Sequence, residues 1–176
     1  MFIIAQIEDV VKLTLDDLDL NIKIIQELNI KYTNNVINNI GLAISIEKLR
    51  KIYHYKIVDG YLHASVKFDV IFFKFFENET IYAKIYKQEE NGIWLALPFF
   101  MNIFVKEENL PKDSSKTFTN SKNNRKNVLW YWMYKDSKLY FKNNETVRFK
   151  VTKIEFSPFL VYGRMNDPGL GPISWW

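Results

Sequence analysis

The sequence predicts a small α+β unit followed by a small β-barrel, and three observations support this fold class. One amphipathic helical segment is followed by the longest run of alternating apolar and polar residues in the chain. Beyond that run, only short strands and turns recur. Aromatic residues make up 16% of the 176 residues, a share that suits pleated, half-buried surfaces. A chain of this length holds one domain or two small ones.

The first part, residues 1–78, is expected to contain a strand, a helix and two further strands. The opening strand covers residues 1–7. A helix is expected from about Leu15 to about Lys31, because Thr14 can cap it and apolar residues then recur at helical spacing. Core packing explains this apolar stripe, although its width also allows contact with a partner.

Two glycines mark the remaining strands of the first part. Gly41 interrupts an apolar segment, which indicates a bent strand with a bulge or a close backbone approach. The dipeptide Asp59-Gly60 predicts a tight turn, and the long alternating strand follows it up to Phe72. The composition changes after Phe76, where we place the domain boundary between residues 78 and 79.

The second part, residues 79–176, contains short strands typical of a small barrel or sandwich. These strands are expected over residues 80–86, 93–97, 103–105, 128–134, 138–141 and 146–153. The Lys-, Asn- and Ser-rich stretch 112–127 is expected to be a mobile loop, because it has too little apolar surface to order itself. Near Lys153 the alternation changes parity, which predicts a β-bulge.

The charge is distributed unevenly along the chain. Residues 1–78 carry nine Lys and Arg against ten Asp and Glu, whereas residues 79–176 carry fifteen against ten. Such asymmetry favours a polyanionic partner for the second part, although an ordinary solvated surface would also account for it.

Several classes of chemistry have no candidate residues. With Cys 0 and only two isolated histidines, the chain offers no thiolate site or disulfide and no zinc site without several carboxylate ligands, and a reducing intracellular compartment is expected. No Gly-rich phosphate loop, HExxH or GxSxG motif occurs. We therefore expect no enzyme activity and no cofactor. No apolar run approaches 18 residues and no signal-peptide features open the chain, so a membrane-spanning or secreted protein is not expected.

Basic strands with interleaved aromatic residues are the one functional pattern. On the exposed face of an oligonucleotide-binding barrel, rings stack on bases and Lys or Arg contact phosphates. Alternation selects six candidates for nucleic-acid binding: Lys84, Tyr86, Trp94, Lys106, Arg148 and Lys150. The competing interpretation is that Trp94 and its neighbours are barrel core.

Six segments together resemble one known family. They are MFIIAQIEDVVKL, NNIGLAI, VDG, KFFENETIYAKI, NGIWLALPFF and the terminal DPGLGPISWW. In this order and spacing they are similar to the stalk subunit of RNA polymerase III, whose family includes the seventh subunit of RNA polymerase II and the archaeal counterpart of that subunit. The similarity runs nearly end to end, and the tail is its most specific part.

The resemblance implies a fold and a role. It implies an RNP-like tip domain over residues 1–78 and an S1-like OB-fold domain over residues 79–176. The family is non-catalytic, nuclear and acts in transcription initiation: with a small helical partner subunit it forms a heterodimer, the stalk, on the polymerase III core, contacts initiation factors and binds exiting single-stranded RNA. Residues matching the family's core-docking turn are Val58, Asp59 and Gly60. The alternative is a free-standing S1-type RNA-binding protein in translation or RNA decay, which would need no stoichiometric partner.

Overall fold

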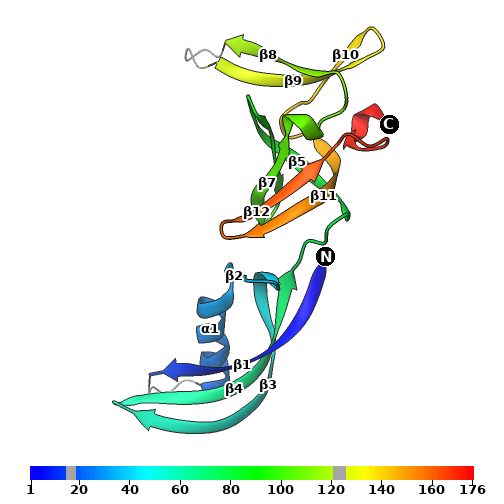
Figure 1. The fold of residues 1–176 in the computed structure, drawn as a ribbon. Coiled ribbons are helices and arrows are strands. Elements are labelled where there is room, and N and C mark those ends of the chain that lie inside the picture. The colour runs from blue at the N-terminus through cyan, green and yellow to red at the C-terminus, as the bar shows by residue number, and fades with distance from the viewer. Residues whose placement is uncertain (15–18, 121–125) are drawn as a thin grey trace. The chain divides into compact units, whose positions relative to one another are not determined.

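The chain divides into two compact units in the computed structural model (Figure 1). Unit 1 is Met1–Lys74 and unit 2 is Phe75–Trp176. The structure describes residues 1–14, 19–120 and 126–176. Each unit has its own sheet and its own core, and each is described here by itself.

Unit 1 is a four-stranded antiparallel sheet with one helix on one face. The strand order is β1-β4-β3-β2. The bounds are β1 Phe2–Leu13, α1 Leu20–Tyr32, β2 Val36–Ile37, β3 Gly41–Val58 and β4 Tyr61–Phe73. Helix residues Ile24 and Leu28 are fully buried against alternate residues of the central strand β4, among them Val66 and Phe68. The alternation expected up to Phe72 is therefore the inward face of β4.

The helix begins later than the sequence indicated. It starts at Leu20, and Asp19 caps it by accepting a hydrogen bond from the Asn21 N–H at 2.8 Å. Thr14 does not cap the helix, because its carbonyl and hydroxyl oxygens accept hydrogen bonds from Lys23 Nζ. The expected start at Leu15 falls in the segment 15–18, outside the described residues.

Strand β3 carries a repeated bulge. Its register with β4 slips four times between Ala43 and His54, so three residues of β3 oppose two of β4. For this reason Ile46, Leu49 and Ile52 recur at every third position and still pack on the core on the helix side of the sheet. A period of three is neither the helical nor the strand period, so neither pattern in the sequence indicates this strand.

The close backbone approach at Gly41 and the turn at Asp59-Gly60 are confirmed, but the bent strand through Gly41 is wrong, because Gly41 begins β3 and the preceding β2 pairs back on it. Gly41 has φ 142°, and a Cβ there would clash with the carbonyl oxygen of Phe73. Asp59 and Gly60 have φ values of 49° and 78° and join β3 to β4 in a two-residue hairpin turn.

Unit 2 is built on a closed five-stranded barrel. Its sheet has the order β12-β7-β6-β5-β11-β13, and β12 also pairs with β11, which closes the ring. Strands β12 and β7 are parallel, and the other pairings are antiparallel. The bounds are β5 Thr80–Glu89, β6 Gly92–Leu97, β7 Phe100–Lys106, β11 Thr146–Phe156, β12 Phe159–Arg164 and β13 Gly171–Pro172. The bulge expected near Lys153 is confirmed between Val151 and Lys153.

Between β7 and β11 lies an inserted three-stranded sheet. It follows the short helix η1, Glu107–Asn109, and consists of β8 Ser114–Asn120, β9 Lys126–Tyr134 and β10 Ser137–Tyr140. The expectation of an irregular loop over 112–127 is therefore wrong for 114–120 and 126–127; residues 121–125 lie outside the described part. Cross-strand pairing orders this polar segment: Lys116 opposes Trp130 and its ammonium lies 4.9 Å from that ring.

Buried Gln88 joins the inserted sheet to the barrel. Its side-chain NH₂ donates to the Phe141 carbonyl at 2.8 Å and to Asn143 Oδ1 at 2.9 Å, and its Oε1 accepts from the Trp130 N–H at 2.8 Å. Trp130 is fully buried, and its indole N–H donates to the Glu89 carbonyl at 2.8 Å. A single amide thus satisfies backbone groups of β9 and of the residue that follows β10.

The C-terminal segment packs on the same region. Trp175, in the short helix η2 (Ile173–Trp175), lies 4.7 Å from the Phe141 ring and 5.5 Å from Trp132 between ring centroids. A Cβ on Gly171 would lie 3.3 Å from the Trp175 ring, so a glycine there allows the close approach.

The expected fold class is confirmed in part. The described chain is mostly β, with one α-helix and a five-stranded barrel consistent with an OB-like fold. An RNP-like character for unit 1 remains a prediction. In the described part of the chain, no helix is long and apolar enough to cross a membrane.

Replacing Gln88 by Met should destabilise unit 2 by about 2–4 kcal/mol, because two buried backbone groups lose their partners. Urea or thermal unfolding measures the change. The neighbouring exposed substitution Lys87→Gln should stay within about 0.5 kcal/mol of the wild type. Equal stability of both variants would contradict the role assigned to Gln88.

Candidate nucleic-acid interface

Strands β5 and β11 place basic and aromatic side chains on one outer face of the barrel. On β5, Ala83 and Ile85 are buried in the barrel, so the alternate residues point outward. The register pairs Lys84 with Thr146, Tyr82 with Arg148 and Thr80 with Lys150. Directly paired residues share a face. We call the resulting surface the basic barrel face, and it consists of Tyr82, Lys84, Tyr86, Arg148 and Lys150.

The cations of this face differ from the other barrel cations in their pairing. No carboxylate forms an ion pair with Lys84, Arg148 or Lys150 among the described residues. Elsewhere in unit 2, ion pairs neutralise Lys87, Lys116 and Lys153; their partners are Glu89 at 2.5 Å, Glu107 at 3.2 Å and Glu155 at 2.6 Å. Uncompensated positive charge therefore collects where β5 and β11 pair.

Arg148 is held in place by two neighbours. Its Nη2 donates to the Tyr82 hydroxyl at 2.7 Å, its Nη1 donates to the Gly169 carbonyl at 3.3 Å, and its guanidinium lies 5.1 Å from the Tyr82 ring centroid. The first contact orients an exposed ring, and the second connects the face to the C-terminal segment. Tyr82 and Tyr86 remain about half exposed, at 51% and 53%.

A groove of about 480 Å³ runs beside these two tyrosines. Its lining residues include Tyr82, Lys84, Tyr86, Ala96, Leu97 and Pro98. Exposed rings beside unpaired cations are the arrangement that stacks bases and contacts phosphates in single-stranded nucleic-acid sites.

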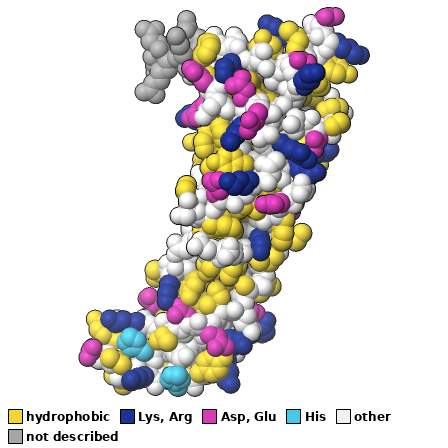
Figure 2. Space-filling view, in the orientation of Figure 1, with side chains coloured by type: hydrophobic (Ala, Val, Ile, Leu, Met, Phe, Trp, Pro, Cys, Tyr) yellow, Lys and Arg dark blue, Asp and Glu magenta, His cyan; other side chains and the backbone are white. Residues whose placement is uncertain are grey.

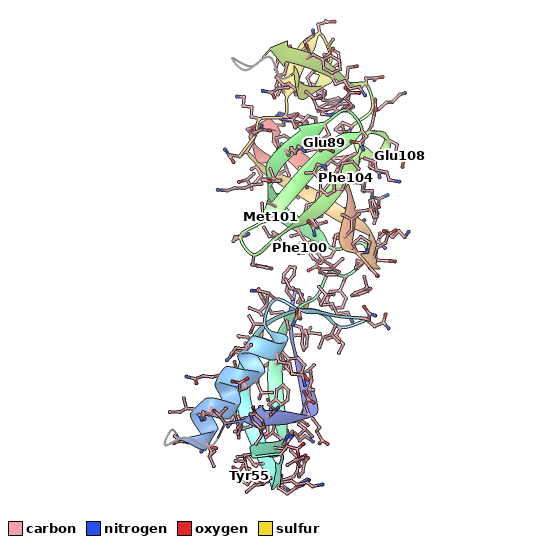
Figure 3. The ribbon with its side chains drawn as sticks, turned by 90° about the vertical axis from the view of Figure 1, so that its left-hand side faces the viewer. Tyr55, Glu89, Phe100, Met101, Phe104 and Glu108 are labelled. Atoms are coloured by element: carbon pink, nitrogen blue, oxygen red, sulfur yellow. The ribbon has the colours of Figure 1, made fainter. Side chains whose placement is uncertain are left out.

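The other two candidates lie on β6 and β7 and do not line this groove. Trp94 opposes Phe104 with 4.6 Å between ring centroids, and its indole N–H donates to Glu89 Oε2 at 2.9 Å. Figure 3 labels Glu89 on β5 and Phe104 on β7, the two strands that flank β6. Trp94 is therefore a half-buried, hydrogen-bonded ring on the outer surface and not barrel core. Lys106 lies 3.8 Å from Glu108, so its charge is partly compensated.

Of the six predicted residues, four therefore lie together, and one further member was missed. The four are Lys84, Tyr86, Arg148 and Lys150. Tyr82 was not predicted, although it stands two residues before Lys84 and shares its parity. The same alternation that selected Lys84 and Tyr86 would have found it.

The Glu89 carboxylate is tuned by its neighbours. The hydrogen bond from Lys87, and then the bond from the Trp94 indole, hold the pKa of Glu89 below its ordinary value. The carboxylate is thus charged at neutral pH and keeps the Trp94 ring oriented.

The predicted docking residues of unit 1 form the tip of the β3–β4 hairpin. Ile57 and Val58 are 65% and 37% exposed, and Tyr55 and Tyr61 are also exposed. Figure 3 labels Tyr55 at this end of unit 1. Exposed apolar and aromatic side chains gathered on one turn are typical of a protein contact. In the described part of the chain, no three His, Asp or Glu residues cluster as metal ligands.

The OB-like barrel places this chain in a fold class that includes many oligonucleotide-binding modules, and here an α+β unit precedes the barrel. The comparisons with known proteins narrow this class. The family model of RNA polymerase III subunit Rpc25 matches residues 79–159. DNA-directed RNA polymerase III subunit RPC8 of Saccharomyces cerevisiae is 32% identical over 89% of this chain and 73% of its own length.

Two other relatives extend this match. DNA-directed RNA polymerase III subunit RPC8 of Bos taurus is 28% identical over 100% of this chain and 98% of its own length. The rpc8 subunit of Dictyostelium discoideum is 30% identical over 90% of this chain and 61% of its own length. The chain belongs to the RNA polymerase III subunit Rpc25/RPC8 family.

Acid titration should release the Trp94 indole. As the pH falls through the lowered pKa of Glu89, the carboxylate protonates and the indole N–H loses its charged acceptor. We expect the Trp94 indole resonance to shift with a midpoint below about 4.3, the ordinary glutamate value. NMR of the full chain measures it. The transition should vanish in Glu89→Gln and persist in Glu155→Gln. A midpoint at or above the ordinary value would contradict this arrangement.

Proposed function

We propose that this protein is a non-catalytic stalk subunit of RNA polymerase III. In this proposal it docks on the polymerase core together with a small helical partner, assists transcription initiation through initiation factors, binds exiting single-stranded RNA and works in the nucleus. The observation that carries the proposal is the similarity, over almost the whole chain, to subunits named as parts of RNA polymerase III.

The hairpin tip of unit 1 supports the docking role. Val58, Asp59 and Gly60 form a turn whose backbone is fixed by positive φ values at Asp59 and Gly60. A preformed turn loses little conformational entropy on binding. The apolar side chains of Ile57 and Val58 are exposed to solvent in the free chain. Burying them against a partner would contribute favourable free energy to binding.

The basic barrel face supports the RNA role. Lys84, Arg148 and Lys150 have no carboxylate partners among the described residues, so phosphates meet uncompensated charge. Tyr86 offers an exposed ring that stacks on any base, whereas the Tyr82 ring already has the Arg148 guanidinium 5.1 Å from its centroid. Binding driven by these groups is independent of RNA sequence and sensitive to salt.

The docking role predicts a loss of copurification. A tagged chain carrying Ile57→Ser and Val58→Ser should recover far less of the large polymerase III subunits than the wild type, because two apolar contacts are lost at the tip. Quantitative mass spectrometry of the purified complexes measures the recovery. The matched control is Phe118→Ser with Met133→Ser, two exposed apolar residues of unit 2. Recovery of the wild type as a free monomer would favour the free-standing RNA-binding protein instead.

The RNA role predicts a change in salt dependence. Neutralising Lys84, Arg148 and Lys150 together to Gln should weaken binding to oligouridylate and reduce the slope of log affinity against log salt by about 2, since each lost phosphate contact removes about 0.7. Tyr86→Ala should lower affinity by about 1–3 kcal/mol with the slope unchanged.

The control for this experiment removes the same number of charges. In this control, Lys87, Lys116 and Lys153 are changed together to Gln. Each of these lysines forms an ion pair with a glutamate in the wild type, so removing them should leave the slope of log affinity against log salt unchanged. Equal slopes for the wild type and the basic-face variant would remove this face from the RNA site.

A further inference from the structure

The sheet of unit 1 has one face that its own helix does not cover. Because α1 packs on the buried residues of β4, the intervening β4 residues point to the opposite face, and their partners on β1 and β3 point there with them. From one end of the sheet to the other, the rows are Phe2–Phe73–Leu42, Ile4–Ile71–Ser45, Gln6–Asp69–Lys48, Glu8–Lys67–Lys51, Val10–Ser65–His54 and Lys12–His63–Lys56.

The rows change in chemistry along the sheet. The first two are almost entirely apolar, and Phe2 and Ile4 are 56% and 63% exposed. The last four are polar except for the exposed Val10, and Lys and His make up more than half of their residues. Figure 2 shows the histidine side chains at the surface of unit 1 with basic side chains beside them.

Both carboxylates in these rows already have cationic partners. Asp69 is buried, and its carboxylate accepts a hydrogen bond from Arg50 Nε at 2.7 Å and another from Gln6. Glu8 accepts from the Tyr53 hydroxyl at 2.7 Å and lies 3.3 Å from Lys67 Nζ. The bond from Arg50 is the main cause of a lowered pKa of Asp69, and the bond from Tyr53 is the main cause of a lowered pKa of Glu8, so both are ionised at neutral pH.

Four lysines of the same face form no ion pair with a described residue, although the charges of Lys48 and Lys51 help to lower the pKa values of Asp69 and Glu8. Among the described residues, no carboxylate forms an ion pair with Lys12, Lys48, Lys51 or Lys56. We call these four lysines, with His54 and His63, the basic sheet face. Although residues 1–78 are slightly acidic overall, this face carries a net positive charge.

The spacing of the lysines fits an extended polypeptide. On β4, Lys48 opposes Asp69 and Lys51 opposes Lys67, two residues away. In the last row, Lys12 and Lys56 lie on either side of His63. Two strand residues span about 6.6–6.8 Å, which is also the separation of alternate side chains in an extended segment. Carboxylates at every second residue of such a segment would therefore meet successive rows.

A nucleic acid fits this face less well. The two rings at its basic end are already occupied: Lys12 lies 3.6 Å from the Tyr61 centroid and Lys51 lies 5.0 Å from the Tyr53 centroid. Base stacking needs a free ring face. The apolar rows beside the basic ones can pack against apolar side chains of a protein. A phosphate-sugar backbone has no apolar side chains to offer them.

We propose that the uncovered face of unit 1 binds an extended acidic polypeptide, with an apolar anchor on the rows of Phe2 and Ile4 and alternating carboxylates along the basic sheet face. The site lies on a different unit from the basic barrel face, and it does not rest on RNA binding.

A labelled synthetic peptide tests this proposal on the full chain. The probe has two leucines followed by glutamates alternating with serines, and a second peptide carries lysine in place of glutamate. Fluorescence anisotropy should show binding of the glutamate peptide alone. Changing Lys48, Lys51 and Lys56 together to Gln should weaken binding about tenfold, because three exposed ion pairs are lost. Ile4→Ser should weaken it independently of salt.

The matched control and the competitor separate the sources of binding. The barrel variant with Lys84, Arg148 and Lys150 changed to Gln should bind the peptide as the wild type does, and thermal melting should show that all variants are folded. Unchanged affinity in the Lys48, Lys51 and Lys56 variant would overturn the proposal. It would also be overturned if oligouridylate displaced the peptide from the barrel variant, since the sheet face would then take phosphates.

Discussion

Each unit of this protein can cover only one side of its sheet with its own residues. In unit 1 a single helix of 13 residues packs on the inward positions of β4 and leaves the opposite face open. In unit 2 the barrel encloses its own core, so the outward positions of every strand face solvent. A small chain built in this way necessarily presents large sheet surfaces, and the charge placed on them decides what they can bind.

The two surfaces share one property: most of their cations form no ion pair with a described carboxylate. Elsewhere on the barrel strands, Lys87, Lys106 and Lys153 each lie next to a glutamate and contribute little net field. On the uncovered face of unit 1 the carboxylates are already bonded, and on the β5–β11 face the three cations pair with none of the described carboxylates. The two faces also differ in whether an exposed aromatic ring is free to stack on a base. No described cation lies over the Tyr86 ring of the barrel, whereas a lysine lies over Tyr53 and another over Tyr61 in unit 1.

The sequence predicted what depends on strand alternation and on turn chemistry. The long strand after Asp59-Gly60, the bulge near Lys153 and the outward parity of Lys84 and Tyr86 follow from period two and from residues that tolerate positive φ. Contacts between distant segments were not predictable in this way. Residues 114–120 form a strand because they pair with β9, and β9 in turn is held by Gln88 from another strand. Likewise, the three-residue period of β3 exists only through its bulged pairing with β4.

Hydroxyl-radical footprinting of the chain, alone and within purified RNA polymerase III, tests the central claim that these open faces are binding surfaces. The account predicts that labelling of Phe2, Tyr55 and Tyr61 in unit 1 drops in the assembled enzyme, while Phe118 on the inserted sheet serves as the exposed reference. Equal labelling of Phe2, Tyr55 and Tyr61 in the free and assembled states would contradict it.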